Sequence, residues 1–303
     1  MKVLSVSQIR VALLGAAVVG STGHVCLAQA PPDQPAVTVR GQTYTPQSIL
    51  ARNMGTDADQ TTAFPPHKVV GNIYYVGTRT LSSFLITTPA GHILINSTYE
   101  RNVRTIEQSV TQLGFKFADV RILLGTHAHG DHQEGDALVK ELTGAQVMVM
   151  NEDVPALAAI KPGSKVHPID RTLRDGDEVT LGGTTLVAHL TPGHTRGCTT
   201  WTMRAQEGGR NLDVVFACSY RAPSTVTPEV ENEFNRTFTL LRSLPCDVPL
   251  GDHPAQYNLM AKYARLAAGA PAPFVDPANC WQEAEIQEAM LRAQVQMQQK
   301  GGQ

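Results

Sequence analysis

The stretch THAHGDH (residues 126–132) decides how this chain is interpreted. It directly follows VRILLG (residues 120–125), an apolar run whose length and polar borders are typical of a buried strand. Three histidines and one aspartate therefore stand within six residues at the end of a strand. Neutral imidazole and carboxylate are good ligands for zinc when several of them converge from a sharply turned loop. The stretch predicts a two-metal hydrolytic centre.

The spacing within this stretch indicates how two ions would be shared. His127 and His129 can converge on one ion, while Asp131 and His132 point toward a neighbouring ion. The alternative is that these residues lie on the surface or cap a helix that starts near Gln133. Four residues of ligand type at this spacing favour the metal site.

Length and composition favour a globular protein that acts on a small molecule. The chain has 303 residues, of which 42% are hydrophobic and 17% charged, so it can bury a large core. The net charge of -2 and the lack of any lysine- or arginine-rich run argue against nucleic acid or an acidic membrane as a partner. We expect a monomer.

The N-terminus has the pattern of a secretory signal peptide. Lys2 and Arg10 precede an apolar run at 11–20, and LAQA (residues 27–30) supplies a small-residue cleavage site. We predict cleavage after Ala30, a periplasmic location and no membrane attachment after cleavage. A membrane anchor is the alternative, but the run is shorter than the roughly 20 residues needed to span a bilayer. Lipidation at Cys26 is a further alternative.

Four cysteines remain after that cleavage: Cys198, Cys218, Cys246 and Cys280. An even number in an exported protein favours disulfides, with three possible connectivities. Cys246 and Cys280 would tie a late strand to the C-terminal segment. Cys198 and Cys218 either pair with each other or remain buried thiols, and Cys218 can alternatively be a metal ligand.

The order of predicted elements indicates two mixed sheets. Residues 31–66 have no sustained periodicity and are interpreted as an N-terminal extension that wraps or caps the domain, with order beginning near His67. The domain itself is placed at 67–303. Its strands are expected at 69–76, 82–88, 92–96, 120–126, 146–150, 198–204, 213–218 and 247–253, with hairpins over 171–190, and its amphipathic helices at 100–114, 133–143, 230–241, 256–268 and 281–299. Residues 151–165 are expected to form a short helix and a Pro-Gly loop that could border the site.

Each half of this order runs through strands and then helices. Two mixed sheets packed face to face, with helices on the outer faces, accommodate that order. The predicted fold class is therefore α/β (α+β), an αββα sandwich. Such a layout places loops from several strands along one edge of the sandwich.

Five of the ten histidines stand at predicted strand ends, and these are the candidate metal ligands: His127, His129, His132, His194 and His253. His194 follows a strand that Pro192 and Gly193 end sharply. The last ligand ends DVPLGDH (residues 247–253), which repeats the pattern of an apolar strand closed by a histidine. The histidines at 67, 92, 167 and 189 are interpreted as ordinary polar residues.

These motifs together resemble the metallo-β-lactamase superfamily, over about residues 67–280. Three shorter stretches resemble subclass B3 of its β-lactamases: GNIYYVGT (71–78), GCTTW (197–201) and LPCD (244–247). The resemblance implies an αββα sandwich with two zinc ions. It also implies two ligand sets, the first made of His127, His129 and His194, and the second made of Asp131, His132 and His253.

Ser219 is the position that discriminates within the superfamily. Glyoxalase-like and lactonase-like members usually place a bridging aspartate after the strand that corresponds to 214–217, and other lactamase subclasses place a cysteine ligand there. Aligning Ser219 with the serine typical of subclass B3 removes both and favours a β-lactamase. A shift of one residue would instead make Cys218 a ligand.

The activity that this resemblance implies is hydrolysis of the β-lactam amide bond in penicillins, cephalosporins and carbapenems by a zinc-bound hydroxide. Asp131 would ligate zinc and orient the hydroxide. Ser219 and Arg221 would bind the carboxylate of the substrate, although Arg221 can alternatively face solvent. Such an enzyme would contribute to antibiotic resistance.

Two other functions fit the same motifs. The first is an ester, thioester or lactone hydrolase, such as a lactonase or a glyoxalase-like thioesterase, because a fold does not determine a substrate. The second is an exported zinc-binding protein without turnover.

Overall fold

The computed structural model describes residues 34–161 and 165–301. From Gln34 onward they belong to one compact unit. The predicted signal peptide at 1–30 lies outside the described residues. Within the described ranges, no helix has both the length and the apolar character needed to cross a membrane.

The first sheet has seven strands that pair in the order of the sequence. β3 to β6 form an antiparallel meander, and β6 to β9 are parallel to one another. The bounds are β3 (His67–Val70), β4 (Ile73–Tyr75), β5 (Phe84–Thr88), β6 (Gly91–Ile95), β7 (Val120–Leu124), β8 (Gln146–Met150) and β9 (Arg171–Leu173).

The second sheet has five strands, again in the order of the sequence. β10 to β13 are antiparallel, and β14 pairs parallel to β13. The bounds are β10 (Glu178–Leu181), β11 (Thr184–Leu190), β12 (Thr199–Glu207), β13 (Arg210–Ala217) and β14 (Val248–Gly251).

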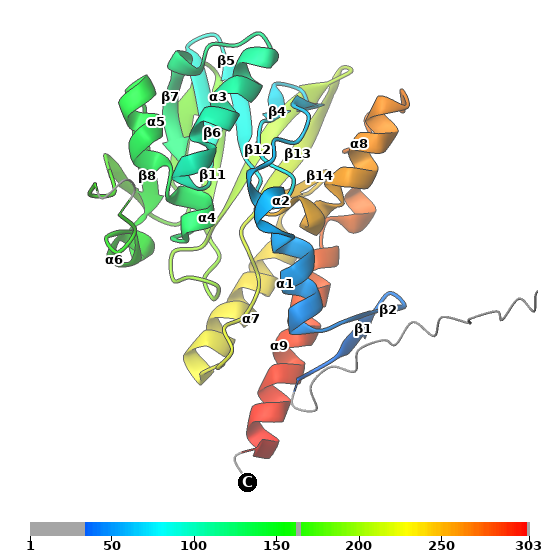
Figure 1. Cartoon of the computed structure of the whole chain (residues 1–303). Helices are drawn as coiled ribbons and strands as arrows, with labels where there is room; N and C mark the ends of the chain where they lie inside the picture. The colour runs from blue at the N-terminus through cyan, green and yellow to red at the C-terminus, as the bar shows by residue number, and fades with distance from the viewer. Residues whose placement is uncertain (1–33, 162–164, 302–303) are drawn as a thin grey trace, which may run out of the picture. The chain divides into compact units, whose positions relative to one another are not determined.

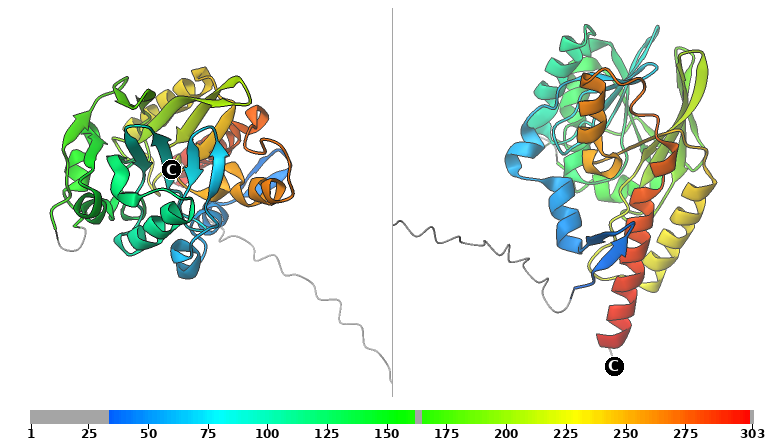
Figure 2. Two further views of the ribbon diagram at one scale, coloured as in Figure 1. Left: turned by 90° about the horizontal axis from the view of Figure 1, so that it is seen from above. Right: turned by 90° about the vertical axis from the view of Figure 1, so that its right-hand side faces the viewer.

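Helices cover the outer faces of the two sheets, so the predicted αββα sandwich is confirmed (Figures 1 and 2). α3 and α5 pack on the seven-stranded sheet, and α7 lies outside the five-stranded sheet. The bounds are α1 (Pro46–Met54), α2 (Asp57–Thr61), α3 (Val103–Gln112), α4 (Gly130–Gln133), α5 (Asp136–Thr143), α6 (Val154–Leu157), α7 (Pro228–Ser243), α8 (Leu259–Ala267) and α9 (Gln282–Gly301).

Strand β6 shows how alternating side chains build two apolar layers. Ile93 and Ile95 face the core between the sheets, where they join side chains from both sheets. Leu94 points to the opposite face and packs with residues of α3. Because successive side chains on a strand point to opposite faces, one apolar run supplies both layers. Both faces of this strand are buried.

The segment before His67 corrects one prediction, because regular structure begins well before that residue. It forms β1 (Val37–Val39), β2 (Gln42–Tyr44), α1 and α2. A capping box starts each of the two helices, with Thr45 and Thr56 as the N-cap residues. Ile49 is buried against residues of α9. These elements are too short to produce a periodicity in the sequence, but the segment does pack on the domain as expected.

Candidate metal centre

The predicted ligands lie where strands from both sheets end at one edge of the sandwich. β7 leads into the histidine loop at 127–132, β11 leads to His194, and β14 leads to His253. The backbone N–H of Thr199 donates to the carbonyl of Thr126 over 2.7 Å, which joins the start of β12 to the end of β7. The two sheets therefore hold this edge together directly.

His127, His129 and His194 form the first group of candidate ligands. One ligand atom of each lies within 4.8 Å of the others. Each pair of these rings has its centroids 4.7 Å apart. His127 is buried, whereas His129 is exposed, so this group reaches from the protein interior to the surface. A substrate can approach it from the side of His129.

Asp131, His132 and His253 form the second group, again with ligand atoms within 4.8 Å of one another. Asp131 Oδ2 lies 3.2 Å from Nε2 of His132 and 3.8 Å from Nε2 of His253. The two groups adjoin, because the ring centroids of His127 and His132 are 4.2 Å apart. The fold therefore brings all six predicted ligands into two neighbouring groups of three, as the sequence predicted; their binding of zinc remains a prediction.

The donor atoms at this centre suit a divalent cation. Among the described residues, Nε2 of His127 and both ring nitrogens of His132 are buried and make no hydrogen bond. A buried polar atom without a partner costs about 1–3 kcal/mol. A metal ion coordinated by these nitrogens would remove that cost, and imidazole with carboxylate is a ligand set that zinc accepts.

Backbone carbonyls orient two of the histidines. His194 Nδ1 donates a hydrogen bond to the carbonyl of Arg221 over 2.7 Å, and His253 Nδ1 donates to the carbonyl of Thr80 over 3.0 Å. Since a carbonyl can only accept, Nδ1 carries the proton in both rings and Nε2 has a lone pair for a metal. The acceptors are backbone carbonyls, so the side chains of Arg221 and Thr80 gave no signal of these interactions in the sequence.

The protonation states of His127 and Asp131 are those that metal binding requires. Burial lowers the pKa of His127 well below its usual value, and the neighbouring histidines lower it further. Burial alone would raise the pKa of Asp131, but His132 and His253 hold it well below its usual range. At neutral pH, His127 is therefore neutral and Asp131 is ionised.

Asp153 is a site residue that the sequence analysis missed. Its Oδ2 accepts hydrogen bonds from the backbone N–H of Ala128 (2.9 Å) and from the hydroxyl of Thr195 (2.8 Å), while Oδ1 accepts from the N–H of Gly197 (2.7 Å). It thereby joins the histidine loop to the loop of His194. A Cβ at Gly197 would lie 2.5 Å from the backbone of Asp153, so this position requires glycine. Asp153 follows β8, and its place just after a strand end was the available signal.

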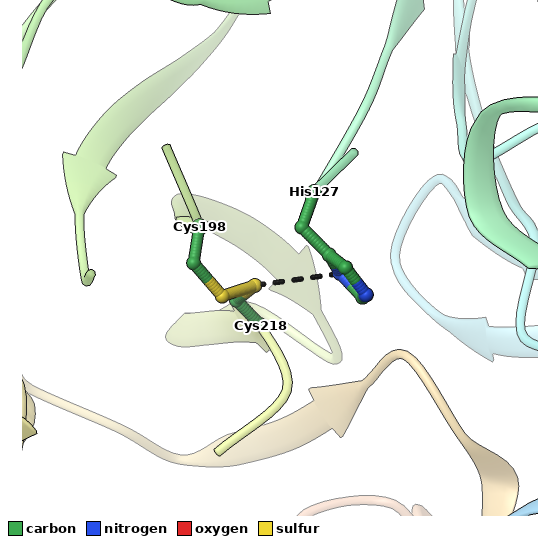
Figure 3. Close-up of side chains that lie close together, drawn as sticks. All are labelled: His127, Cys198 and Cys218. Carbon is green, nitrogen blue, oxygen red and sulfur yellow. Dashed lines mark hydrogen bonds between the residues drawn. A yellow bond between two sulfur atoms is a disulfide. The ribbon is translucent and has the colours of Figure 1, made fainter. Parts of the chain in front are cut away.

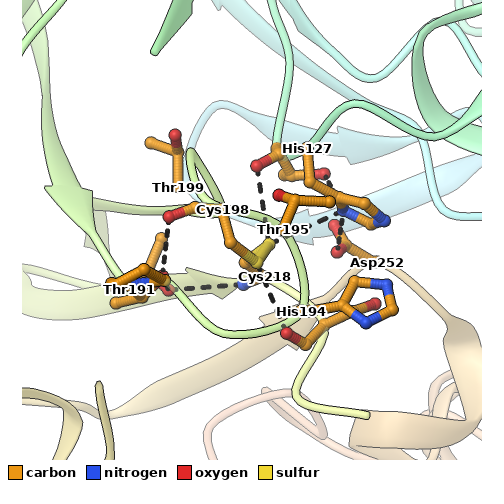
Figure 4. Close-up of a disulfide and its surroundings, with 12 residues drawn as sticks. His127, Thr191, His194, Thr195, Cys198, Thr199, Cys218 and Asp252 are labelled. Carbon is orange, nitrogen blue, oxygen red and sulfur yellow. Dashed lines mark hydrogen bonds and ion pairs between the residues drawn. A yellow bond between two sulfur atoms is a disulfide. The ribbon is translucent and has the colours of Figure 1, made fainter. Parts of the chain in front are cut away.

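Cys198 and Cys218 form a disulfide beside His127 (Figures 3 and 4). The sulfur of Cys218 lies 3.6 Å from His127 Nδ1. A disulfide sulfur is no thiolate, so the pairing removes Cys218 from the candidate ligands. Cys246 pairs with Cys280, as proposed from their positions in the chain.

Ser219 and Arg221 lie next to the centre without joining either group of ligands. Ser219 follows Cys218 beyond the end of β13 and is 5% exposed. Arg221 is exposed, and its backbone carbonyl accepts the hydrogen bond from His194 Nδ1. Burial lowers the pKa of His129 and of His194, and the charge of Arg221 lowers both further. Substrate binding by Ser219 and Arg221 remains a prediction.

Comparison with known proteins agrees with this geometry. The family model of the metallo-beta-lactamase superfamily matches residues 76–206, which include the histidine loop and His194. The curated hydroxyacylglutathione hydrolase of Methylobacterium sp. (strain 4-46) is 30% identical over 181 residues. That alignment covers 60% of this chain and 63% of the relative, so this chain matches less than two thirds of that relative's length.

Solved structures match over nearly their whole length. FEZ-1 metallo-beta-lactamase from Legionella gormanii is 39% identical, with a TM-score of 0.71 over 79% of this chain and 96% of that chain. BJP-1, a subclass B3 metallo-beta-lactamase of Bradyrhizobium japonicum, is 35% identical, with a TM-score of 0.74 over 81% of this chain and 98% of that chain. With its strand-end histidines and αββα sandwich, the chain belongs to the metallo-β-lactamase superfamily and resembles its subclass B3 enzymes.

Proposed function

We propose that this protein is a zinc-dependent β-lactamase that hydrolyses the amide bond of penicillins, cephalosporins and carbapenems. Membership of the superfamily makes it a metallo-hydrolase, and the family implies a divalent metal, typically zinc. The choice of β-lactam as the substrate is the proposal.

The end of β13 is the observation that carries this proposal. Cys218 is bonded to Cys198, and Ser219 follows it, so this strand end offers neither a thiolate nor a carboxylate to a metal. A glyoxalase-like or lactonase-like hydrolase would be expected to have its bridging aspartate there. The similarity to subclass B3 structures over 96% and 98% of their length supports the same choice.

The chain's own residues define the parts of the reaction. His127, His129 and His194 would hold one zinc ion, and Asp131, His132 and His253 a second. Zinc bound there would supply Lewis acidity and make water a nucleophile at neutral pH. Asp131, which is ionised and 15% exposed in its side chain, would act as a ligand and orient the attacking water or hydroxide.

Arg221 and Ser219 would bind the carboxylate that β-lactams carry. Arg221 is exposed, and its backbone carbonyl accepts the hydrogen bond from His194 Nδ1, so its side chain begins beside the first group of ligands. A cationic group there would form a charge-assisted hydrogen bond with the substrate and hold the scissile bond over the ligands. Ser219 is nearly buried, so its hydroxyl would make only a short-range contact.

Hydrolysis of a glutathione thioester is the second candidate. The observation in its favour is that the curated relatives of this chain include several named hydroxyacylglutathione hydrolase. Those alignments cover 60% and 61% of this chain. A chain with this centre can therefore act on a different acyl group.

The deciding experiment measures the zinc-loaded protein with four substrates: nitrocefin, a carbapenem, a glutathione thioester and an acyl-homoserine lactone. We expect hydrolysis of the two β-lactams, loss of that activity after chelation, and recovery with added zinc. His189→Ala, a histidine outside both ligand groups, should retain activity, whereas Asp131→Ala should not. Turnover of the thioester alone would replace this proposal with the second candidate.

A periplasmic location is part of the same proposal. Two disulfides among the described residues suit an oxidising compartment. N-terminal sequencing of the exported protein should give a mature chain that starts directly after Ala30. A chain that retains Met1 or begins at lipidated Cys26 would contradict this.

A further inference from the structure

Asp252 places a buried carboxylate directly against a candidate ligand. It follows β14 and precedes His253 in the chain, and its side chain is 1% exposed. Its Oδ2 lies 3.2 Å from Nδ1 of His127, whose side chain is fully buried (Figure 4). Its residue type and its position before a strand-end histidine gave no signal in the sequence.

The other neighbours of His127 Nδ1 are weaker partners. The hydroxyl of Thr126 lies at 3.4 Å and the disulfide sulfur of Cys218 at 3.6 Å, and neither carries a charge. On the opposite side of the ring, Nε2 is buried and has no hydrogen-bond partner within the described part of the chain. The carboxylate of Asp252 is therefore the group that favours a proton on Nδ1 and leaves the lone pair on Nε2.

Asn96 determines the direction of hydrogen bonding at Asp252. Asn96 Oδ1 accepts from the backbone N–H and from the hydroxyl of Thr126, both over 3.0 Å. Because a backbone N–H can only donate, the other end of this amide must be its Nδ2, which donates to Asp252 Oδ1 over 3.2 Å. Oδ1 is thus occupied, and Oδ2 is the oxygen that remains for His127.

Asn96 itself is held in place by the backbone. Its φ is +62°, a conformation that asparagine tolerates better than most residues. Its N–H donates to the carbonyl of Leu124, and its carbonyl accepts from the hydroxyl of Ser83. Each donor and acceptor from Thr126 through Asn96 to Asp252 is therefore assigned without ambiguity. These hydrogen bonds join the ends of β6, β7 and β14.

We propose that Asp252 is a positioning residue that fixes the tautomer and orientation of His127, so that Nε2 faces the first metal position. The inference rests on the proposed metal-binding function. A carboxylate oxygen of Asp252 also lies within 4.8 Å of ligand atoms of His127 and His132, and the inference gives Asp252 the role of an outer partner of His127 instead of that of a third ligand.

Asp252→Asn tests this role because an amide cannot satisfy both neighbours. If its Nδ2 faces Asn96, two donors oppose each other; if its Nδ2 faces His127, the Nδ1–H of that ring loses its acceptor. We expect a proton to move to Nε2 of His127 in the metal-free ring and zinc affinity to fall about 10–100-fold, as is typical when the outer partner of a ligand is lost.

The double variant Asn96→Asp/Asp252→Asn is the rescue. Its new carboxylate can accept from Thr126 and from the amide at 252, which leaves the amide oxygen for His127. We expect each single variant to bind zinc more weakly than the wild type. We expect the double variant to recover most of the affinity that Asp252→Asn loses. Asp170→Asn is the control, because it changes a carboxylate that pairs with Lys140 of α5 and accepts from the N–H of Val147 in β8, and it should leave zinc affinity unchanged.

The measurements are zinc affinity by competition with a chromogenic chelator, zinc content at saturation, and the tautomer of His127 by nitrogen NMR. Circular dichroism confirms folding of each variant. Wild-type affinity in Asp252→Asn, or a double variant as weak as that single variant, would overturn the inference. So would the loss of a whole zinc equivalent at saturation, which would make Asp252 a ligand. Tight zinc binding by the wild type without β-lactam hydrolysis would instead refute the proposed function alone.

Discussion

The two sheets contribute to the metal centre in different ways. The seven-stranded sheet supplies four candidate ligands from one loop, residues 127–132, directly after β7. The five-stranded sheet supplies one ligand after β11 and one after β14, with Asp252 beside the second. The first contribution is local in sequence, whereas the second exists only once the sheet has formed.

The contacts that hold the two contributions differ accordingly. In the histidine loop, the N–H of His132 donates to the carbonyl of His129, three residues away. The loop of His194 depends on Asp153, which lies more than 40 residues earlier in the chain. Long-range contacts should therefore affect His194 and His253 more than the histidine loop. Four predictions follow this difference, in order of expected effect on hydrolysis.

The largest effect should come from removing one ligand from either sheet. His129→Ala and His194→Ala should each lower kcat/KM for nitrocefin more than a hundredfold, beyond the effect of losing an outer partner. The kcat/KM of His189→Ala should stay within about twofold of the wild-type value, because this side chain forms a hydrogen bond with Thr202 outside the centre. If His129→Ala kept activity while His194→Ala lost it, the local loop would not be the source of the first group.

Asp153→Ala should break the connection between the two loops. It leaves three donors without their acceptor, and we expect an unfolding free energy lower by about 3 kcal/mol and a zinc affinity lower by about 10–100-fold. Denaturant unfolding and zinc competition measure these effects. Asp153→Asn keeps one carbonyl acceptor and should be affected less. Equal zinc affinity in Asp153→Ala and the wild type would show that His194 is placed without this contact.

The two disulfides should separate stability from metal binding. Each closes a loop, of sequence separation 20 for Cys198–Cys218 and 34 for Cys246–Cys280, and replacing either pair by serine should lower stability by about 2–4 kcal/mol. Only the first lies beside His127, so only its loss should also weaken zinc binding. Thermal unfolding and zinc competition on both double variants test this. If both double variants changed zinc affinity equally, the contact between the Cys198–Cys218 disulfide and His127 would have no role in zinc binding.

Arg221→Ala should have the smallest effect. The side chain is exposed, so its contribution is screened by solvent, and we expect the KM for a carbapenem to rise about fivefold with little change in kcat. The carbonyl of residue 221 still accepts from His194 in this variant, so the ligand should stay in place. Arg196→Ala, another exposed arginine near the same loop, is the control. An unchanged KM would leave Arg221 as a solvent-facing residue.

Much of this protein could be predicted from its sequence because the signals were local. Apolar strands that end in histidine predicted the five histidines that the structure brings together as candidate ligands, and Pro192 with Gly193 predicted the sharp exit before His194. Strand–helix alternation predicted the sandwich. The helices and strands at 34–66 were not predicted, since they are short and Ile49 is buried by contact with Tyr44 and the distant α9.

The sequence by itself determined which residues could bind a metal, because imidazole and carboxylate at strand ends carry that information in their type and spacing. Only the tertiary structure decided how they are held. Asn96, Asp153 and Asp252 are ordinary polar residues in the sequence, and the Cys198–Cys218 pairing was one of several possibilities. Their roles arise from hydrogen bonds and contacts between residues that are far apart in the chain, and such contacts exist only after both sheets have packed together.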